Sequence, residues 1–131
     1  MRRGVMAVSI VAVLSMVGCG SSSTTPVGGV YSCNSTADHT CADLAAAPGG
    51  TFNASDVTIL QNLCRAVTGA TWSSTAACPT ASRVGTCTFT SNGAEIGLSG
   101  SLFTQARAYP PITAVAAAAD CALIPGVWTA N

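Results

Sequence analysis

Cys64-Arg65-Ala66-Val67-Thr68-Gly69-Ala70-Thr71-Trp72 is the stretch that decides the fold, because Cys121-Ala122-Leu123-Ile124-Pro125-Gly126-Val127-Trp128 repeats its plan. In each stretch a cysteine ends a predicted helix, a glycine follows five residues later, and a tryptophan lies in a short extended segment after it. A plan that recurs within one chain indicates internal repetition. The two stretches therefore predict a domain made of two related halves.

The helix that leads to Cys64 is predicted by its cap and by its periodicity. Asn53 is a good N-cap, and Asp56 three residues later can complete a capping box. Gly69 is a plausible stop after the last turn. Apolar side chains recur at helical intervals, at Val57, Leu60, Leu63, Cys64 and Val67. The segment therefore predicts a helix with one buried face.

Residues 83–91 alternate as a strand is expected to, and Asn92-Gly93 follows them directly. This dipeptide favours a two-residue turn that closes a β-hairpin. A further strand over residues 101–109 would then complete a β-meander. The predicted cross-strand pairs are Phe89 with Ile96 and Cys87 with Leu98.

The remaining segments predict shorter elements. Residues 30–47 are expected to form short strands around a turn at 34–36, and residues 70–74 an extended piece. An Ala-rich helix is expected over 113–122, followed by a last short strand at 127–129. The fold class predicted for residues 30–131 is a small, disulfide-stabilised α+β domain, with two short helices, a β-meander and two related halves.

The first 18 residues predict a secretory signal peptide. Arg2 and Arg3 give a positively charged start, and residues 4–18 form an uncharged, mostly apolar run. That run is shorter than the roughly 20 apolar residues that a membrane-spanning helix needs. Its apolar side chains would cover every face of a helix, which argues against a buried amphipathic helix of the domain. Residues 1–18 are therefore expected to be removed on export.

The end of this run, Met16-Val17-Gly18-Cys19, resembles the lipobox of bacterial lipoproteins. Gly18 and Cys19 match the motif, whereas Met16 departs from its usual leucine. The resemblance implies that the Cys19 sulfur receives a diacylglycerol and that the new amino terminus is acylated. Because Gly20 rather than aspartate follows, it also implies a place in the bacterial cell envelope on the outer membrane. The alternative is ordinary cleavage near Gly18 or Gly20, which would leave Cys19 as a plain thiol.

Residues 19–29 are expected to be the lipidated cysteine and a flexible tether. The stretch after Cys19, GSSSTTPVGG, is polar and of low complexity. A flexible coil of this length reaches about 16–19 Å on average. The domain is therefore expected to stay close to the membrane to which the lipid attaches it.

The chain has seven cysteines, an odd number for an exported protein. Setting Cys19 aside for lipid leaves an even set that can form three disulfides in an oxidising compartment. The absence of any C-x-x-C spacing gives no support to a zinc ribbon or a thioredoxin-like centre. The predicted disulfide cysteines are Cys33, Cys41, Cys64, Cys78, Cys87 and Cys121. The repeated plan suggests the pairs Cys87–Cys121, Cys41–Cys64 and Cys33–Cys78, one of the fifteen ways in which six cysteines can pair.

Charge excludes two classes of partner. After residue 18 the chain carries three arginines, five acidic residues and no lysine. A nucleic-acid partner would require a basic face, so none is expected. Polybasic attraction to an anionic membrane is excluded for the same reason. The membrane is therefore expected as a partner only through the lipid on Cys19.

No catalytic constellation is apparent. His39 is the only histidine, and its neighbours Asp38 and Asp43 do not specify a triad by their spacing. The five carboxylates are scattered singly, so they suggest no pair for glycoside hydrolysis. We therefore expect no enzyme, no cofactor and no metal site.

Aromatic residues and arginine are the best candidates for recognition. Trp72 and Trp128 are assigned to packing because of their place in the repeated plan. Arg107 and Tyr109, two apart on one predicted strand, are the candidate binding residues. The predicted function is a structural or binding module of the envelope, contacting another envelope protein or a polysaccharide. The alternative is a secreted inhibitor or toxin-like effector whose disulfides resist proteases.

Overall fold

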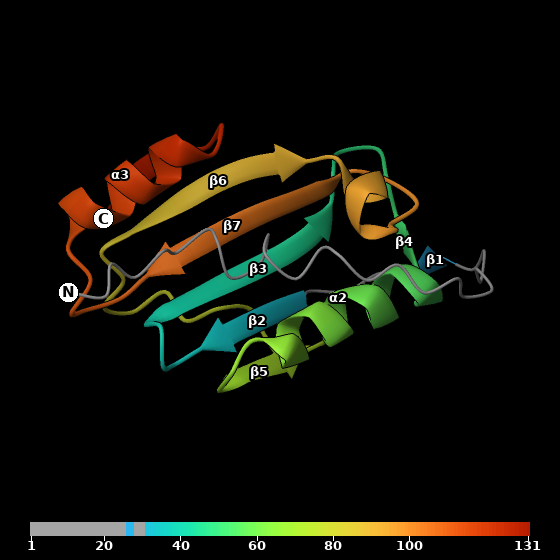
Figure 1. The fold of residues 1–131 in the computed structure, drawn as a ribbon, viewed down its shortest axis with the longest axis horizontal. Coiled ribbons are helices and arrows are strands. Elements are labelled where there is room, and N and C mark those ends of the chain that lie inside the picture. The colour runs from blue at the N-terminus through green and yellow to red at the C-terminus, as the bar shows by residue number, and fades with distance from the viewer. Residues whose placement is uncertain (1–25, 28–30) are drawn as a thin grey trace.

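A six-stranded antiparallel sheet with two helices makes up the domain (Figure 1). The protein is represented by a computed structural model that describes residues 26–27 and 31–131. With three disulfides, this is the predicted small α+β fold. The signal peptide, Cys19 and most of the tether lie outside the described residues. Two tether residues that are described, Pro26 and Val27, form strand β1.

The chain passes twice through the same strand–strand–helix–strand sequence. The first half comprises β2 (Tyr31–Ser35), β3 (Thr40–Ala46), α2 (Ala54–Ala66) and β5 (Ala70–Ser73). The second comprises β6 (Gly85–Ser91), β7 (Leu102–Ala108), α3 (Ala114–Leu123) and β8 (Val127–Ala130). The short strand β4 (Phe52–Asn53) pairs with β1 (Pro26–Val27) outside the main sheet. The strand order β5-β2-β3-β7-β6-β8 places the halves about a pseudo-two-fold axis between β3 and β7.

One register row across all six strands makes this symmetry explicit. Its residues in order are Trp72, Cys33, Ala42, Ala106, Cys87 and Trp128. Each half thus contributes tryptophan, cysteine and alanine in the same order toward the axis. The repeated plan in the sequence therefore reflects two related halves of the fold.

Each helix is joined by a disulfide to the outer of the two long strands of its own half. Cys33 on β2 bonds to Cys64 near the end of α2, and Cys87 on β6 bonds to Cys121 near the end of α3. Because Cys33 and Cys87 belong to the same register row, both helices lie on one face of the sheet. The third disulfide joins Cys41 to Cys78. All six predicted cysteines are bonded and the pair Cys87–Cys121 is confirmed, but the predicted pairs Cys41–Cys64 and Cys33–Cys78 are wrong.

The large apolar side chains of the core lie under α2. Tyr31, Leu44 and Leu60 are buried there with Phe52, Leu98 and Leu102. Trp72 packs against this cluster, with its ring 5.6 Å from that of Tyr31 and nearly parallel to it. Under α3 the helix contributes only two buried residues, Ala117 and Cys121. The second half therefore depends more on its disulfide than the first half does.

The start of α2 carries the predicted capping box. Asn53 accepts a hydrogen bond from the Asp56 N–H, and Asp56 accepts one from the Asn53 N–H, both at 2.9 Å. Asp56 is buried and also accepts from the N–H and the hydroxyl of Ser99, at 2.8 and 2.6 Å. Burial alone would raise the pKa of Asp56, but these hydrogen bonds outweigh it and hold the pKa below its usual value. The carboxylate thus ties the first turn of α2 to the loop before β7.

Replacing Asp56 with asparagine is expected to cost about 1–3 kcal/mol, because an amide oxygen cannot accept all three hydrogen-bond donors. Since the folded pKa of Asp56 is lowered, its stabilisation is present above the unfolded pKa of about 3.9. It is lost as the pH falls through the folded pKa. Urea unfolding can be followed by tryptophan fluorescence between pH 7 and 2. The free energy of unfolding should fall less steeply with decreasing pH for Asp56→Asn than for the wild type. Glu95→Gln removes an exposed carboxylate. It should leave both the free energy of unfolding at pH 7 and its pH dependence unchanged.

The predicted turn at Asn92-Gly93 is wrong, although the strand before it is present. The Asn92 side chain accepts from the Ala94 N–H and caps a 3-10 helix, η1 (Gly93–Ile96). The hairpin closes over a ten-residue connection, residues 92–101, in place of the predicted two-residue turn, with Ser91 opposite Leu102. Phe89 is therefore opposite Thr104 and Cys87 opposite Ala106, in place of the predicted partners Ile96 and Leu98. The three-strand meander becomes a two-strand hairpin with a folded connection.

The remaining predicted elements lie close to their expected positions. The turn expected at residues 34–36 lies at 36–39, where His39 has a positive φ of 54°. The expected strands and helices at 70–74, 83–91, 101–109, 113–122 and 127–129 are present within a few residues of their predicted ends.

Gly93 is needed where η1 meets the loop that leads to β7. A Cβ at this position would overlap the carbonyl oxygen of Gly100 and approach the Leu98 side chain. Gly93→Ala is therefore expected to destabilise the domain by about 3 kcal/mol, since backbone must move to admit the methyl group. A Cβ at Gly100 meets nothing within 4 Å, so Gly100→Ala is a matched control with little expected effect. Equal midpoints for the two variants in urea unfolding would contradict this description of the connection.

Candidate functional site

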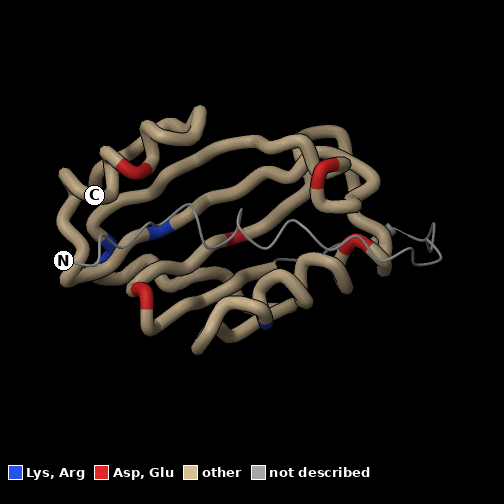
Figure 2. Tube along the Cα trace, viewed as in Figure 1, with Lys and Arg blue, Asp and Glu red and all other residues tan. Residues whose placement is uncertain are grey.

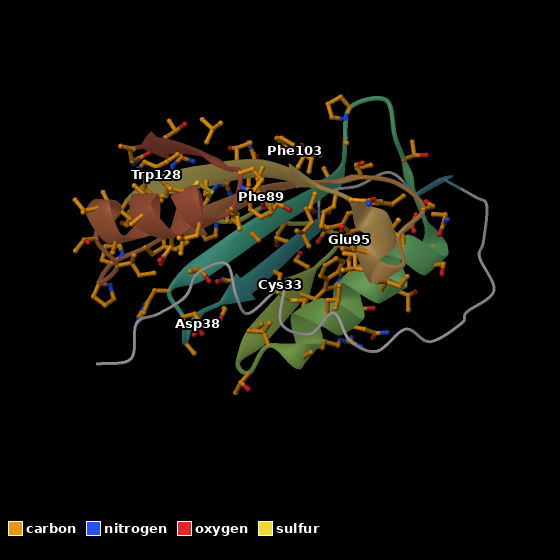
Figure 3. All side chains as sticks on the ribbon, turned by 45° about the horizontal axis from the view of Figure 1, so that its top comes forward. Cys33, Asp38, Phe89, Glu95, Phe103 and Trp128 are labelled. Carbon is orange, nitrogen blue, oxygen red and sulfur yellow. A yellow bond between two sulfur atoms is a disulfide. The ribbon has the colours of Figure 1, made fainter. Side chains whose placement is uncertain are left out.

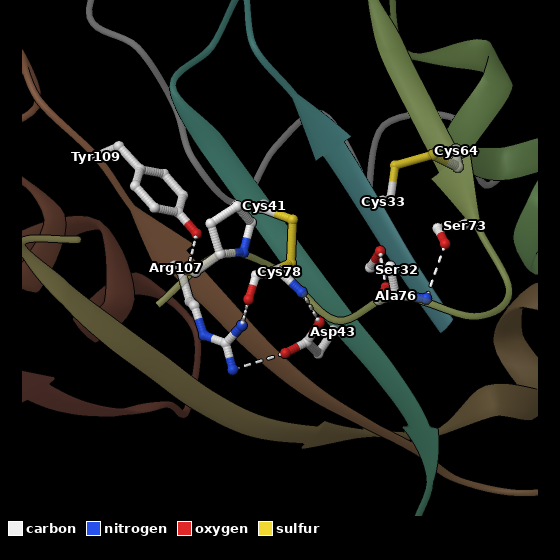
Figure 4. The surroundings of a disulfide bond; sticks show 11 residues. Ser32, Cys33, Cys41, Asp43, Cys64, Ser73, Ala76, Cys78, Arg107 and Tyr109 are labelled. Carbon is white, nitrogen blue, oxygen red and sulfur yellow. Dashed lines mark hydrogen bonds and ion pairs between the residues drawn. A yellow bond between two sulfur atoms is a disulfide. The ribbon is translucent and has the colours of Figure 1, made fainter. Parts of the chain in front are cut away.

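Residues 74–84, here called the linker, connect the two halves across the sheet face that the helices leave free. The linker runs past β2, β3 and β7, and each of these strands holds it (Figure 4). The Ser32 hydroxyl on β2 donates to the Ala76 carbonyl at 2.7 Å. On β3, Cys41 is bonded to Cys78. The predicted binding residues Arg107 and Tyr109 contact the same segment.

The Cys78 peptide is held on both sides by an ion pair. Asp43 accepts a hydrogen bond from the Cys78 N–H at 2.7 Å, and Arg107 donates to the Cys78 carbonyl. The two side chains also meet each other, with Arg107 Nη2 2.7 Å from Asp43 Oδ2. Both are largely buried, with side-chain exposures of 10% and 15%. At that depth their charges are stabilised mainly by each other.

The ion pair lies across the pseudo-two-fold axis. Because Ala42 is opposite Ala106 in the register, Asp43 and Arg107 occupy related positions in the two halves. They share the face opposite the helices and meet diagonally across the central strand pair. An acidic residue in one half and a basic residue in the other thus form one contact at the junction of the halves.

Tyr109 fixes the next linker residue. Its hydroxyl donates to the Pro79 carbonyl at 2.6 Å. Burial raises the pKa of Tyr109, the charge of Asp43 raises it further, and Arg107 partly opposes this. The phenol is therefore a neutral donor at physiological pH. The polar atoms of Arg107 and Tyr109 are largely used within the domain, and a role for them in ligand binding remains a prediction.

The residues considered for catalysis are engaged elsewhere or lie at the surface. His39 is exposed at the β2–β3 turn, and its carbonyl accepts from the Tyr109 N–H. Asp38 accepts from the Ser35 hydroxyl at 2.7 Å, while Asp43 is occupied by Arg107 and Cys78. Neither carboxylate is hydrogen-bonded to the imidazole in the described part of the chain. Asp43 thus serves to hold the linker, and Asp38 is engaged within its own turn.

Trp128 takes a packing position that matches that of Trp72. It lies at the end of the sheet that α3 covers (Figure 3), over Gly85, where a Cβ would overlap its ring. Gly126 likewise approaches the disulfide of this half, because a Cβ there would lie 2.7 Å from the Cys87 sulfur. The two glycines of the repeated plan therefore act differently: Gly69 supplies a positive φ of 76°, and Gly126 supplies close approach.

The sequence predicts only some of the contacts that hold the linker. Cys78 was identified as a disulfide cysteine, but Asp43 was not identified as the partner of Arg107. Within residues 26–27 and 31–131, no group of three or more His, Cys, Asp or Glu side chains could hold a metal ion. In the same ranges no helix is long and apolar enough to cross a membrane. Comparison with protein-family models, with curated proteins and with solved structures gives no match.

Proposed function

We propose that this protein is an exported lipoprotein, anchored in the bacterial cell envelope through lipid on Cys19, whose domain is a structural or binding module. The observation that supports this proposal is the state of the other six cysteines, all of which form disulfides. Disulfides form and persist in oxidising compartments. They also leave Cys19 as the one cysteine without a partner inside the domain, in the position where the lipobox resemblance expects a lipid.

The domain has the properties expected of a binding module outside the cytoplasm. Three covalent links and the linker contacts hold both halves to one sheet, and Asp43 and Arg107 are used internally. A rigid, crosslinked scaffold loses little conformational freedom when it binds a partner, which favours binding. An envelope protein or a polysaccharide is the class of partner that this location provides. We propose no reaction for it.

The intact mass of the protein from membrane fractions tests the proposal. We expect a chain that begins at Cys19, carries diacylglycerol and an acyl chain, and lacks six hydrogens because of three disulfides. Cys19→Ser should abolish the added lipid mass and leave the disulfides unchanged. An unmodified soluble form that begins after Gly20 would contradict the anchor and favour the secreted alternative.

A further inference from the structure

The described part of the tether is attached to the domain at one end of the sheet. β1 pairs antiparallel with β4, with Pro26 opposite Asn53 and Val27 opposite Phe52. β4 is itself fixed, because Phe52 is 2% exposed in the core and Asn53 caps α2. Figure 1 shows β1 and β4 together at the end of the molecule where α2 begins. We call this end, with the connection over residues 92–101, the β4 end.

The pairing of β1 with β4 depends on Val27. Proline has no N–H, so Pro26 cannot donate a hydrogen bond to the neighbouring strand. The Asn53 N–H is already used, because it donates to Asp56 at 2.9 Å. The hydrogen bonds of the antiparallel pair therefore fall between Val27 and Phe52. The chain is thus fixed to the domain ahead of β2, the first strand of the main sheet.

This attachment shortens the part of the tether that separates the domain from the predicted lipid. From Cys19 to Pro26 there are seven residue steps, which span at most about 23–25 Å. A seven-residue strand such as β3 or β7 is itself about 20 Å long. The opposite end of the sheet could therefore reach the membrane only with the tether almost fully extended alongside it. Few chain conformations satisfy that condition, so conformational entropy opposes it.

The opposite end of the sheet is built from both halves of the domain. The Tyr109 N–H donates to the His39 carbonyl at 3.0 Å, and the Val84 N–H donates to the Ala108 carbonyl at 2.8 Å. The Asn131 N–H donates to the Val84 carbonyl at 3.3 Å. These hydrogen bonds bring together the β2–β3 turn, the end of the linker and the last residue of the chain. We call this the far end.

We propose that the β1–β4 pair holds the domain on the membrane with its β4 end toward the lipid and its far end outward. The proposal rests on the lipid that we propose for Cys19 and adds an orientation to it. Because the polar surface of a folded domain cannot enter the hydrocarbon of a bilayer, a domain attached at one end by a short segment extends away from the membrane. A partner elsewhere in the envelope then meets the far end first, which includes Tyr109.

Electrostatic attraction does not hold another face of the domain on the bilayer. Attraction to anionic lipid requires a cluster of about four to eight basic residues. The described ranges carry three arginines, which Figure 2 shows on separate parts of the chain, and Arg107 is neutralised by Asp43. Glu95 is exposed at the β4 end, but the repulsion from a single carboxylate is screened within about 10 Å. The reach of the tether therefore decides the orientation.

Collisional fluorescence quenching in vesicles tests the orientation. The lipidated full chain, produced with its own leader, is labelled at Glu95→azidophenylalanine in the β4 end or at Ala37→azidophenylalanine in the β2–β3 turn. Both native side chains are exposed, and azide chemistry leaves the disulfides intact. The vesicles are phosphatidylcholine with a nitroxide on the lipid headgroup. Quenching should be at least about twofold stronger at position 95 than at position 37, because a tether of this length averages about 13–16 Å.

Val27→Pro tests the role of the β1–β4 pair, because it removes the N–H on which the pairing depends. The tether then first meets the domain at Tyr31, twelve steps after Cys19, so the ratio of the two quenching values should fall toward one. Ser22→Pro introduces the same residue ahead of β1 and should leave the ratio unchanged. Circular dichroism checks that both variants are folded. If Val27→Pro does not fold, the ratio in the chain with an intact pair decides.

The orientation and the anchor fail in different ways. Equal quenching at positions 95 and 37, or an unchanged ratio in folded Val27→Pro, would overturn the orientation and leave the lipid anchor standing. A chain that does not bind the vesicles and is quenched at neither position would overturn both proposals.

Discussion

Reduction of the three disulfides is expected to unfold the domain at neutral pH. The bridges close loops of similar size, with sequence separations of 31, 37 and 34 residues. On the loop-entropy model each contributes roughly 4 kcal/mol. The free energy of unfolding of a native domain is about 5–15 kcal/mol in total. The loss of two bridges therefore already approaches this total. Near-UV circular dichroism during reduction provides the measurement. Retention of the full signal after complete reduction, verified by mass, would contradict the prediction.

The two helix-to-strand bridges allow a finer form of this experiment. Replacing Cys87 and Cys121 with alanine should release α3, because the helix buries only Ala117 besides its cysteine. Replacing Cys33 and Cys64 should leave α2 in place, since Leu60 and the Asp56 hydrogen bonds still hold it. Hydrogen exchange should therefore show loss of protection over residues 114–123 in the first variant and retention over 54–66 in the second. Equal protection of both helices would mean that packing holds α3 more strongly than its small side chains indicate.

The start of α2 could be predicted from the sequence because its determinants are local. Asn53 and Asp56 satisfy each other's N–H groups within one turn, whatever surrounds them. The second role of Asp56 could not be predicted. Ser99 reaches it from 43 residues away, and no local pattern links the two.

The predicted hairpin failed because a local preference was outweighed by an alternative that is also local. Asn92-Gly93 can form a two-residue turn, but an asparagine can equally cap a helical turn by accepting from the backbone two residues later. The cap brings Leu98 into the core beside Phe52 and Leu60. The apolar run that was interpreted as a strand is thus used as a folded loop.

The disulfide pairing was only partly predictable, although the sequence contained the information that would have corrected it. The repeated plan led to Cys87–Cys121, a bridge between a helix end and a strand. Applied to the first half, the same plan requires Cys33–Cys64, because β2 and β6 are related positions. Cys41 and Cys78 then remain for each other. Two of the three bridges therefore follow the symmetry of the two halves, and the third links β3 of the first half to the linker.

The sequence suggests Arg107 as a binding residue because it lies two residues from Tyr109 on one predicted strand. Its actual surroundings depend on the linker, a Ser/Thr/Ala-rich segment that the sequence describes only as a loop. Asp43 and Cys78 reach it from separate parts of the chain. Contacts of this kind arise from the arrangement of the two halves, so they could not be inferred from spacing.

Replacing Arg107 with methionine is expected to destabilise the domain by about 3–5 kcal/mol. The variant keeps the length of the side chain but leaves the Asp43 carboxylate largely buried without its counter-ion. Hydrogen exchange should show the linker released, because the Cys78 carbonyl loses its donor. Arg83→Met is the matched control, since among the described residues the Arg83 side chain makes one hydrogen bond, an exposed one to Asn131. This variant should change stability by less than about 0.5 kcal/mol.

The double variant Asp43→Asn with Arg107→Met separates two contributions of Arg107. One is its ion pair with Asp43, and the other is its hydrogen bond to the Cys78 carbonyl. Removing both charges should recover most of the loss, since the unpaired carboxylate is the main cost, and the asparagine oxygen can still accept from the Cys78 N–H. A double-mutant cycle in urea should therefore give a coupling of about 2–3 kcal/mol, the range expected for residues in one buried network. If the double variant is as unstable as Arg107→Met alone, the linker is held through the Arg107 hydrogen bond to the Cys78 carbonyl. In that case charge pairing across the axis contributes little to joining the two halves.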